Sequence, residues 1–198
     1  ILSGLVGSEM CIRDRSEAPQ AVEAVHAAYI DSGANVITSN SYAVVPFHIG
    51  EERFAAEGQA LAALAGELAR RAVEASGKPV RVAGSLPPLF GSYRPDLFDA
   101  SRVEEVLSPL VKGLSPFVDL WLAETQSSIA EARAIHAGLP KDGKPFWLSF
   151  TLKDEEVDEV PRLRSGEPVA EAAAAAAQLG VQTLSLIHIS EPTRPERI

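Results

Sequence analysis

The chain has 198 residues, 46% of them hydrophobic, and a formal net charge of −9 at pH 7. This acidic balance argues against a nucleic-acid partner, which would require a basic surface. No apolar run reaches the ~18 residues that a membrane span needs, so we expect a cytoplasmic protein with no membrane partner. The length allows one domain on the usual scale of ~100–200 residues.

The two ends of the chain read as translated DNA adapter. Residues 5–14 read LVGSEMCIRD, and residues 184–194 read LSLIHISEPTR. One DNA stretch that resembles a transposase-based library adapter encodes the second string, and its reverse complement encodes the first in another frame. We therefore interpret residues 1–15 and 184–198 as non-native, exclude them from fold reasoning as one excludes a tag, and expect the native segment to be 16–183. Cys11, the only cysteine, then says nothing about a reactive thiol.

Between these ends, helical and strand patterns alternate. Helices are expected where apolar residues recur at helical spacing or alanine dominates, at residues 18–31, 52–76, 101–114, 128–138 and 167–179. Ser101, with Glu104 three residues on, is a predicted N-cap, as is Ser127 or Ser128. Short apolar runs predict strands at residues 35–39, 80–84, 118–123, 145–151 and 181–184.

Strands that alternate with helices indicate parallel βαβ units. An open doubly wound sheet and a (β/α)8 barrel both fit this order. No G-x-G-x-x-G follows any strand, which weakens the dinucleotide-binding version. The last predicted strand runs into the adapter string, and LSLIHI is itself β-prone, so a structure can extend that strand with non-native residues.

Polar side chains gather just after the predicted strands, where both architectures place their active sites. They include Asn40, Tyr42, Ser85, Glu124 and Lys153. A carboxylate such as Glu124 at a strand end can bind an ammonium group, take a proton or hold a metal, and a role beside a helix cap or in a salt bridge is equally compatible. Asn40 offers a donor and an acceptor, and Tyr42 offers a hydroxyl and an apolar face, although ordinary loop capping is the simpler interpretation.

Three further features have competing interpretations. The loop at 84–96 is a candidate lid or acceptor-binding wall, although Arg94 and Asp96 can also just pair with each other. Lys153 stands where a Schiff-base lysine can sit, yet it opens an acidic run that is typical of a solvated loop. His48 and the two glutamates that follow it look superficially like metal ligands, but their spacing does not match a metallohydrolase helix, and a solvated turn is expected.

Four segments together resemble the homocysteine S-methyltransferase family. They are DSGANVITSNSY, VAGSLPP followed by SYRPDLF, LWLAETQSSIAEARA, and PFWLSFTL followed by RLRSGEP. Their order and spacing agree with the family over nearly all of residues 16–183. The resemblance implies an α/β fold, a (β/α)8 TIM barrel, of which this chain supplies about strands 2–6 and is truncated at both ends.

The resemblance also implies a chemistry. Members transfer a methyl group from a sulfonium, betaine-like or folate donor to the thiol of homocysteine, a step of methionine biosynthesis. Three cysteines hold a zinc ion that binds homocysteine as the thiolate, because a metal-bound thiol is deprotonated at neutral pH. Carried over by position, Glu124 would hold the amino group of homocysteine, and Tyr42 and Asn40 would line its pocket.

The chain departs from the family pattern at both ends. It changes to adapter inside the sixth barrel strand, so the family's three zinc cysteines lie beyond it, and no metal ligand is assigned. We expect the fragment alone to be inactive and to bind no zinc. Two alternatives stay open: a different (β/α)8 enzyme, such as a Schiff-base lyase using Lys153, and a non-catalytic barrel that binds a small amino acid.

Overall fold

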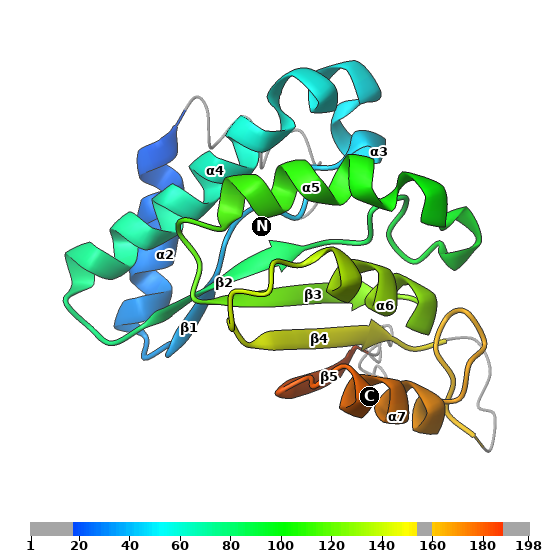
Figure 1. The fold of residues 1–198 in the computed structure, drawn as a ribbon. Helices are drawn as coiled ribbons and strands as arrows, with labels where there is room; N and C mark the ends of the chain where they lie inside the picture. The colour runs from blue at the N-terminus through cyan, green and yellow to red at the C-terminus, as the bar shows by residue number, and fades with distance from the viewer. Residues whose placement is uncertain (1–17, 154–159, 188–198) are drawn as a thin grey trace, which may run out of the picture.

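Strands and helices alternate along residues 18–153 and 160–187, the part of the chain that the computed structural model describes (Figure 1). The strands are β1 (Val36–Thr38), β2 (Arg81–Leu86), β3 (Leu120–Gln126), β4 (Phe146–Thr151) and β5 (Thr183–Ile187). The α-helices are α2 (Pro19–Asp31), α3 (Pro46–Ile49), α4 (Glu51–Ser76), α5 (Val103–Leu114), α6 (Ile129–Gly138) and α7 (Val169–Gln178). Two 3-10 turns, η1 (Pro95–Leu97) and η2 (Ala100–Arg102), precede α5.

The order of the strands decides between the two architectures. All neighbours pair in parallel, and the spatial order β1-β2-β3-β4-β5 follows the chain. A doubly wound sheet would reverse this order at a switch point, whereas a (β/α)8 barrel adds each strand beside the last. Because right-handed crossovers place successive helices on the same side, the sheet curves with helices outside, and the five strands form a half-barrel.

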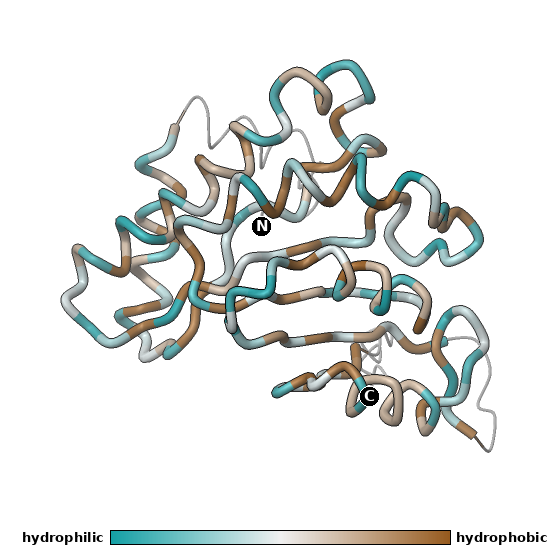
Figure 2. The backbone as a smooth tube through the Cα atoms, in the orientation of Figure 1, coloured by the Kyte–Doolittle hydropathy of each residue, from teal (hydrophilic) through white to brown (hydrophobic). Residues whose placement is uncertain are grey.

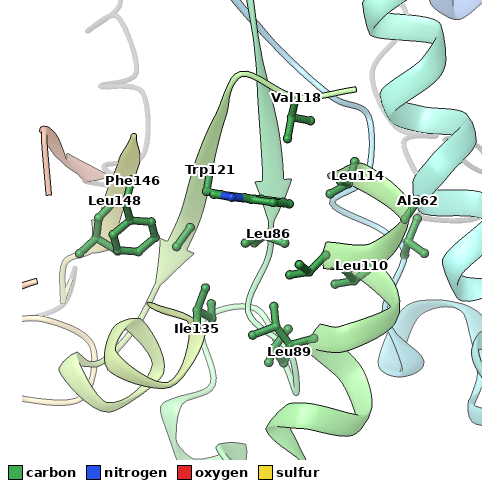
Figure 3. Packing of buried hydrophobic residues seen from close by; sticks show 14 of the residues in the cluster. Ala62, Leu86, Leu89, Leu110, Leu114, Val118, Trp121, Ile135, Phe146 and Leu148 are labelled. Atoms are coloured by element: carbon green, nitrogen blue, oxygen red, sulfur yellow. The ribbon is translucent and has the colours of Figure 1, made fainter. Parts of the chain in front are cut away.

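The helix-facing side of the sheet holds the hydrophobic core. The core residues of β2, β3 and β4 lie on one face of their strands, as expected from the two-residue period of a strand: Val82, Leu86, Trp121, Ala123, Phe146, Leu148 and Phe150. Figure 3 shows the Trp121 indole lying among Val118, Leu86 and Leu114, with Ile135 of α6 below it. In Figure 2, hydrophobic residues run along the strands and α5, and hydrophilic residues gather in the loops.

One glycine lets α4 and α5 approach closely. A Cβ atom added at Gly113 of α5 would lie 2.5 Å from the Gln59 carbonyl oxygen and 2.8 Å from the Ala63 amide nitrogen, both on α4. Side chains cannot occupy that space without moving backbone, so a glycine is required where α5 crosses α4.

The helix starts test the predicted caps. Ser128 and Glu131 form a complete capping box at the start of α6, which confirms the prediction there. The predicted N-cap at Ser101 is wrong. The Asp99 carboxylate accepts the Ser101 backbone N–H, so residues 100–102 form η2, and α5 begins only at Val103. An aspartate that bonds two residues ahead favours a tight turn over an immediate helix start.

The last strand extends past residue 183. Residues 184–187 pair with β4, from Leu184 opposite Leu148 to Ile187 opposite Thr151. Leu184 and Leu186 are 38% and 43% exposed. The β-prone string thus continues the strand as expected, and its assignment to adapter stays a prediction. Within the described residues, no helix is both long enough and apolar enough to cross a membrane.

Candidate active site

Loops from four strands meet at the carboxyl ends of the half-barrel, the side on which (β/α)8 enzymes place their sites. The segment after β4 folds back toward β3, because the Arg164 amide donates to the Thr151 carbonyl and the Ser165 amide donates to the Ser127 carbonyl. Leu163 and Leu152 also form an antiparallel bridge. The loops after β1 and β2 meet on the other side of this edge, where the Tyr42 and Ser92 hydroxyls form a hydrogen bond.

Glu124 lies inside β3 rather than after it, which corrects the predicted strand end at residue 123. Its Oε1 accepts a hydrogen bond from the Ser85 hydroxyl of β2. This polar pair lies on the face of the sheet opposite the core. Both residues are inside their strands. The predicted strand ended before Glu124 because a polar residue after an apolar run is typical of a loop.

A register shift between Ala123 and Gln126 interrupts β3 beside Glu124. Thr125 has φ of 64°, and its amide donates to the Ser149 hydroxyl at 2.9 Å. A positive φ is strained for a β-branched residue, and such strain concentrates at functional sites. The Thr125 side chain lies close enough to Tyr42 to lower the pKa of its hydroxyl group. The bulge therefore turns Thr125 toward the same loops as Glu124, although consecutive residues of a regular strand point to opposite faces.

Burial dominates the electrostatics of Glu124. Desolvation raises the pKa of its carboxyl group above the usual value, and the hydrogen bond from Ser85 opposes that shift. Among the described residues, no lysine or arginine forms an ion pair with Glu124. A half-buried carboxylate without a cationic partner is suited to bind a positively charged group.

Tyr42 lies beside this carboxylate. Its hydroxyl is 2.7 Å from the Ser92 hydroxyl of the loop after β2. Burial raises the pKa of Tyr42, and the neighbouring Glu124 raises it further. Tyr42 and Glu124 thus lie near enough to interact electrostatically. Asn40 is half-buried in the same turn as Tyr42. Binding roles for all three remain predictions.

The structure also shows where the loop at 84–96, Lys153 and His48 lie. In the loop at 84–96, Arg94 pairs with Asp96 at 2.6 Å, the alternative considered above, while Ser92 supplies the wall beside Tyr42. Lys153 is exposed. His48 lies in the short helix α3 rather than in a solvated turn, with its ring 4.1 Å from that of Phe47.

Three buried serines surround this site: Ser85 was noted from the sequence only as a polar residue near a strand end, and Ser39 and Ser41 were not recognised at all. Ser39, Ser41 and Ser85 are 3%, 0% and 0% exposed and are connected by hydrogen bonds. The one available signal was a hydroxyl residue inside the apolar runs VITSNS and VRVAGSL.

The described side chains do not fit the family's zinc ion. Nowhere in residues 18–153 and 160–187 do three His, Cys, Asp or Glu side chains come together as a metal site. The ligands that the resemblance implies are cysteines, and Cys11 lies outside the described residues.

Comparison with known proteins identifies the family. The model of the family described as homocysteine S-methyltransferase matches residues 3–192. The metallated form of the Escherichia coli homocysteine methyltransferase MmuM superposes with a TM-score of 0.78 at 28% identity, covering 93% of this chain and 68% of that one. Its apo form gives a TM-score of 0.70 at 27% identity, covering 88% and 64%. None of the curated proteins compared with the chain matches it.

The family match includes residues on both sides of the segment 16–183, and it covers far more than half of the 198 residues. The same half-barrel of parallel strands is what the family's barrel predicts for this part of the chain. The chain therefore belongs to the homocysteine S-methyltransferase family.

Proposed function

We propose that this chain is the acceptor-binding part of an enzyme that methylates the thiol of homocysteine, with Glu124 as the partner of the substrate's ammonium group. The observation that carries the proposal is the state of Glu124. It is half-buried, one of its oxygens is held by Ser85, and it forms no ion pair with a described cation. A cationic substrate group would compensate the cost of burying this charge.

The residues around Glu124 would orient the acceptor. An amino-acid thiol has its ammonium group at one end and its sulfur at the other, so anchoring the first fixes where the second lies. Tyr42 and Asn40 would line the pocket, and the Tyr42 ring would cover the aliphatic part of the substrate. In the reaction the sulfur gains a methyl group from the donor and loses its proton. Sulfonium, betaine-like and folate compounds are all candidate donors.

We further propose that residues 1–15 and 184–198 derive from adapter, that 16–183 is native, and that the family's zinc ligands belong to the uninterrupted gene product, called the complete enzyme below. The chain alone would then be inactive. Reading the genomic DNA across residue 183 tests this proposal. A cysteine codon within a few residues, followed later by a Cys-Cys pair, supports it, whereas genomic DNA that encodes LSLIHISEPTR contradicts it.

A transfer assay tests the function itself. The complete enzyme, loaded with zinc, is incubated with homocysteine and each donor class, and methionine is detected by mass. We expect methionine with at least one donor, and a higher KM for homocysteine in Glu124→Gln. Glu105→Gln, which removes an exposed carboxylate on α5, is the matched control. A folded, zinc-loaded enzyme that transfers no methyl group with any donor would overturn the proposal.

Lys153 offers the comparison with a Schiff-base lyase. Such lysines are activated by burial in an apolar pocket, and Lys153 is exposed. The structure therefore favours the methyltransferase over the lyase. Loss of borohydride trapping of a carbonyl substrate in Lys153→Ala would reverse this preference.

A further inference from the structure

Ser85, the second-last residue of β2, makes hydrogen bonds through its hydroxyl, its amide and its carbonyl group. It is 0% exposed, and its hydroxyl donates to Glu124 Oε1. Its amide donates to the Ser39 hydroxyl at 3.0 Å, and its carbonyl accepts from the Ser41 hydroxyl at 2.8 Å. All three polar groups of Ser85 therefore have a defined partner.

The proton count of these hydroxyls fixes the direction of each bond. A serine hydroxyl has one hydrogen to donate. Ser41 uses its hydrogen on the Ser85 carbonyl, so in the 2.9 Å contact between the Ser39 and Ser41 hydroxyls the donor is Ser39. The result is a closed ring that runs from Ser39 to Ser41, on to the carbonyl of Ser85, and back from the Ser85 amide to Ser39. This serine ring fixes the backbone of Ser85 from the β1 side.

We propose that Ser85 is a positioning residue for acceptor binding: its hydroxyl holds one oxygen of Glu124, so that the other oxygen, Oε2, meets the ammonium group of the amino-acid thiol. This inference rests on the proposed function. Among the described residues the Glu124 carboxylate makes no second side-chain hydrogen bond, which leaves Oε2 for the ligand. The serine ring supplies the rigidity, because a donor that cannot rotate away holds the carboxylate in one orientation.

The groups around Glu124 allow a change in its pKa to be detected from the pH dependence of homocysteine binding. Burial raises the pKa of Glu124, and the Ser85 hydrogen bond opposes that shift. Tyr42 is the titratable neighbour coupled to it among the described residues, and burial raises the pKa of Tyr42, so Tyr42 stays neutral in the acid range. Removing the Ser85 hydroxyl removes the opposing interaction. Glu124 should then take up its proton at a higher pH, and affinity for an ammonium group should fall at a higher pH.

The test uses Ser85→Ala in the complete enzyme, with the homocysteine KM and kcat measured from pH 5 to 8. Ser85 orients Glu124 and does not itself bind the substrate, so its loss should cost less than the direct charged contact. We expect the KM for homocysteine to rise about five- to tenfold near pH 7, and kcat and the KM for the donor to stay within about twofold. The acid limb of 1/KM should move to higher pH. Ser127→Ala is the matched control, because Ser127 is equally buried but its hydroxyl pairs with Thr151 instead.

Two further variants keep the test decisive. Ser85→Thr keeps the hydroxyl and should restore the KM and the acid limb. Ser85→Cys has nearly the same size but is a weak donor, and it should give intermediate values even if Ser85→Ala fails to fold. An unchanged KM and acid limb in folded Ser85→Ala, with Glu124→Gln still impaired, would overturn the role of Ser85 alone. A wild-type enzyme without methyl transfer would instead overturn the proposed function.

Discussion

Replacing Thr125 by glycine and by alanine should reverse the order of stability that strands normally show. In a regular strand, glycine is less stable than alanine by about 0.5–1 kcal/mol because it loses more backbone freedom on folding. Thr125 is 5% exposed in β3 but has φ of 64°. A left-handed residue with a Cβ costs about 1–2 kcal/mol, and glycine does not have this cost.

The magnitudes can be worked out from the contacts. Both substitutions remove the hydroxyl that interacts with Tyr42, a loss of about 0.5–1.5 kcal/mol, and the methyl group, worth about 0.8 kcal/mol. Alanine keeps the strain, so Thr125→Ala should lose about 1–2 kcal/mol of stability. Glycine relieves the strain, so Thr125→Gly should stay within about 1 kcal/mol of wild type and lie about 0.5–1 kcal/mol above alanine.

The assay is denaturant unfolding of the complete enzyme, followed by far-UV circular dichroism. Ala123→Gly, two residues before Thr125 on the same strand and 0% exposed, is the matched control and should be destabilised by about 1 kcal/mol or more. A Thr125→Gly variant that is less stable than Thr125→Ala would contradict the inference that the positive φ at residue 125 strains a residue with a Cβ atom.

Three other changes follow from the packing and the pH dependence. Gly113→Ala forces a Cβ against the backbone of α4 and should cost about 1–3 kcal/mol in urea unfolding, whereas Gly138→Ala meets only the flexible end of Leu107 and should cost less. Ser128→Ala removes the capping box of α6, and its melting temperature should fall by an amount equivalent to about 1 kcal/mol. Burial lowers the pKa of His26, partly opposed by Glu23, so folding favours the neutral form of the imidazole. The contribution of His26 to stability should be complete above pH 6.5 and fall below it. His26→Gln should reduce that fall, as measured by the free energy of unfolding at about pH 7.5 and about pH 5.5. Equal losses of stability in Gly113→Ala and Gly138→Ala would contradict the first expectation. An unchanged melting temperature in Ser128→Ala would contradict the second, and an unchanged pH dependence in His26→Gln would contradict the third.

The sequence predicted the alternation of elements because helical periodicity and apolar strands are local signals. The helix at 52–76 was expected within one residue of α4 (Glu51–Ser76). The short helix α3 was missed, since four residues carry too little periodicity to be recognised. The pattern of elements alone could not decide between a barrel and a doubly wound sheet, because both have the same order along the chain and differ only in which strands pair. The family resemblance implied the barrel, and the strand order confirms a partial one.

The site was predicted in part. Glu124 and Tyr42 were recognised as polar residues near strand ends, and in the structure they lie near enough to interact electrostatically. The bulge at Thr125 was not foreseeable, because a threonine after a strand carries no mark of a positive φ. Nor was the serine ring, which joins residues 44 and 46 positions apart in the chain and exists only once β1 and β2 have paired.

The ends of the chain illustrate a separate limit. Residues 184–187 pair with β4 through backbone hydrogen bonds, which any β-prone segment can form. Such pairing does not distinguish a native strand from translated adapter. Genomic sequence can make that distinction.

The most direct test of the central claim compares homocysteine with the same thiol acid lacking its amino group, 4-sulfanylbutanoate, as acceptors for the complete enzyme. A charge-assisted hydrogen bond is worth about 1.5–3 kcal/mol, so wild type should prefer homocysteine in kcat/KM by roughly 10- to 100-fold. In Glu124→Gln this preference should shrink toward one, because the ammonium group has lost its partner. An unchanged preference in Glu124→Gln would contradict the claim that Glu124 binds the substrate's ammonium group.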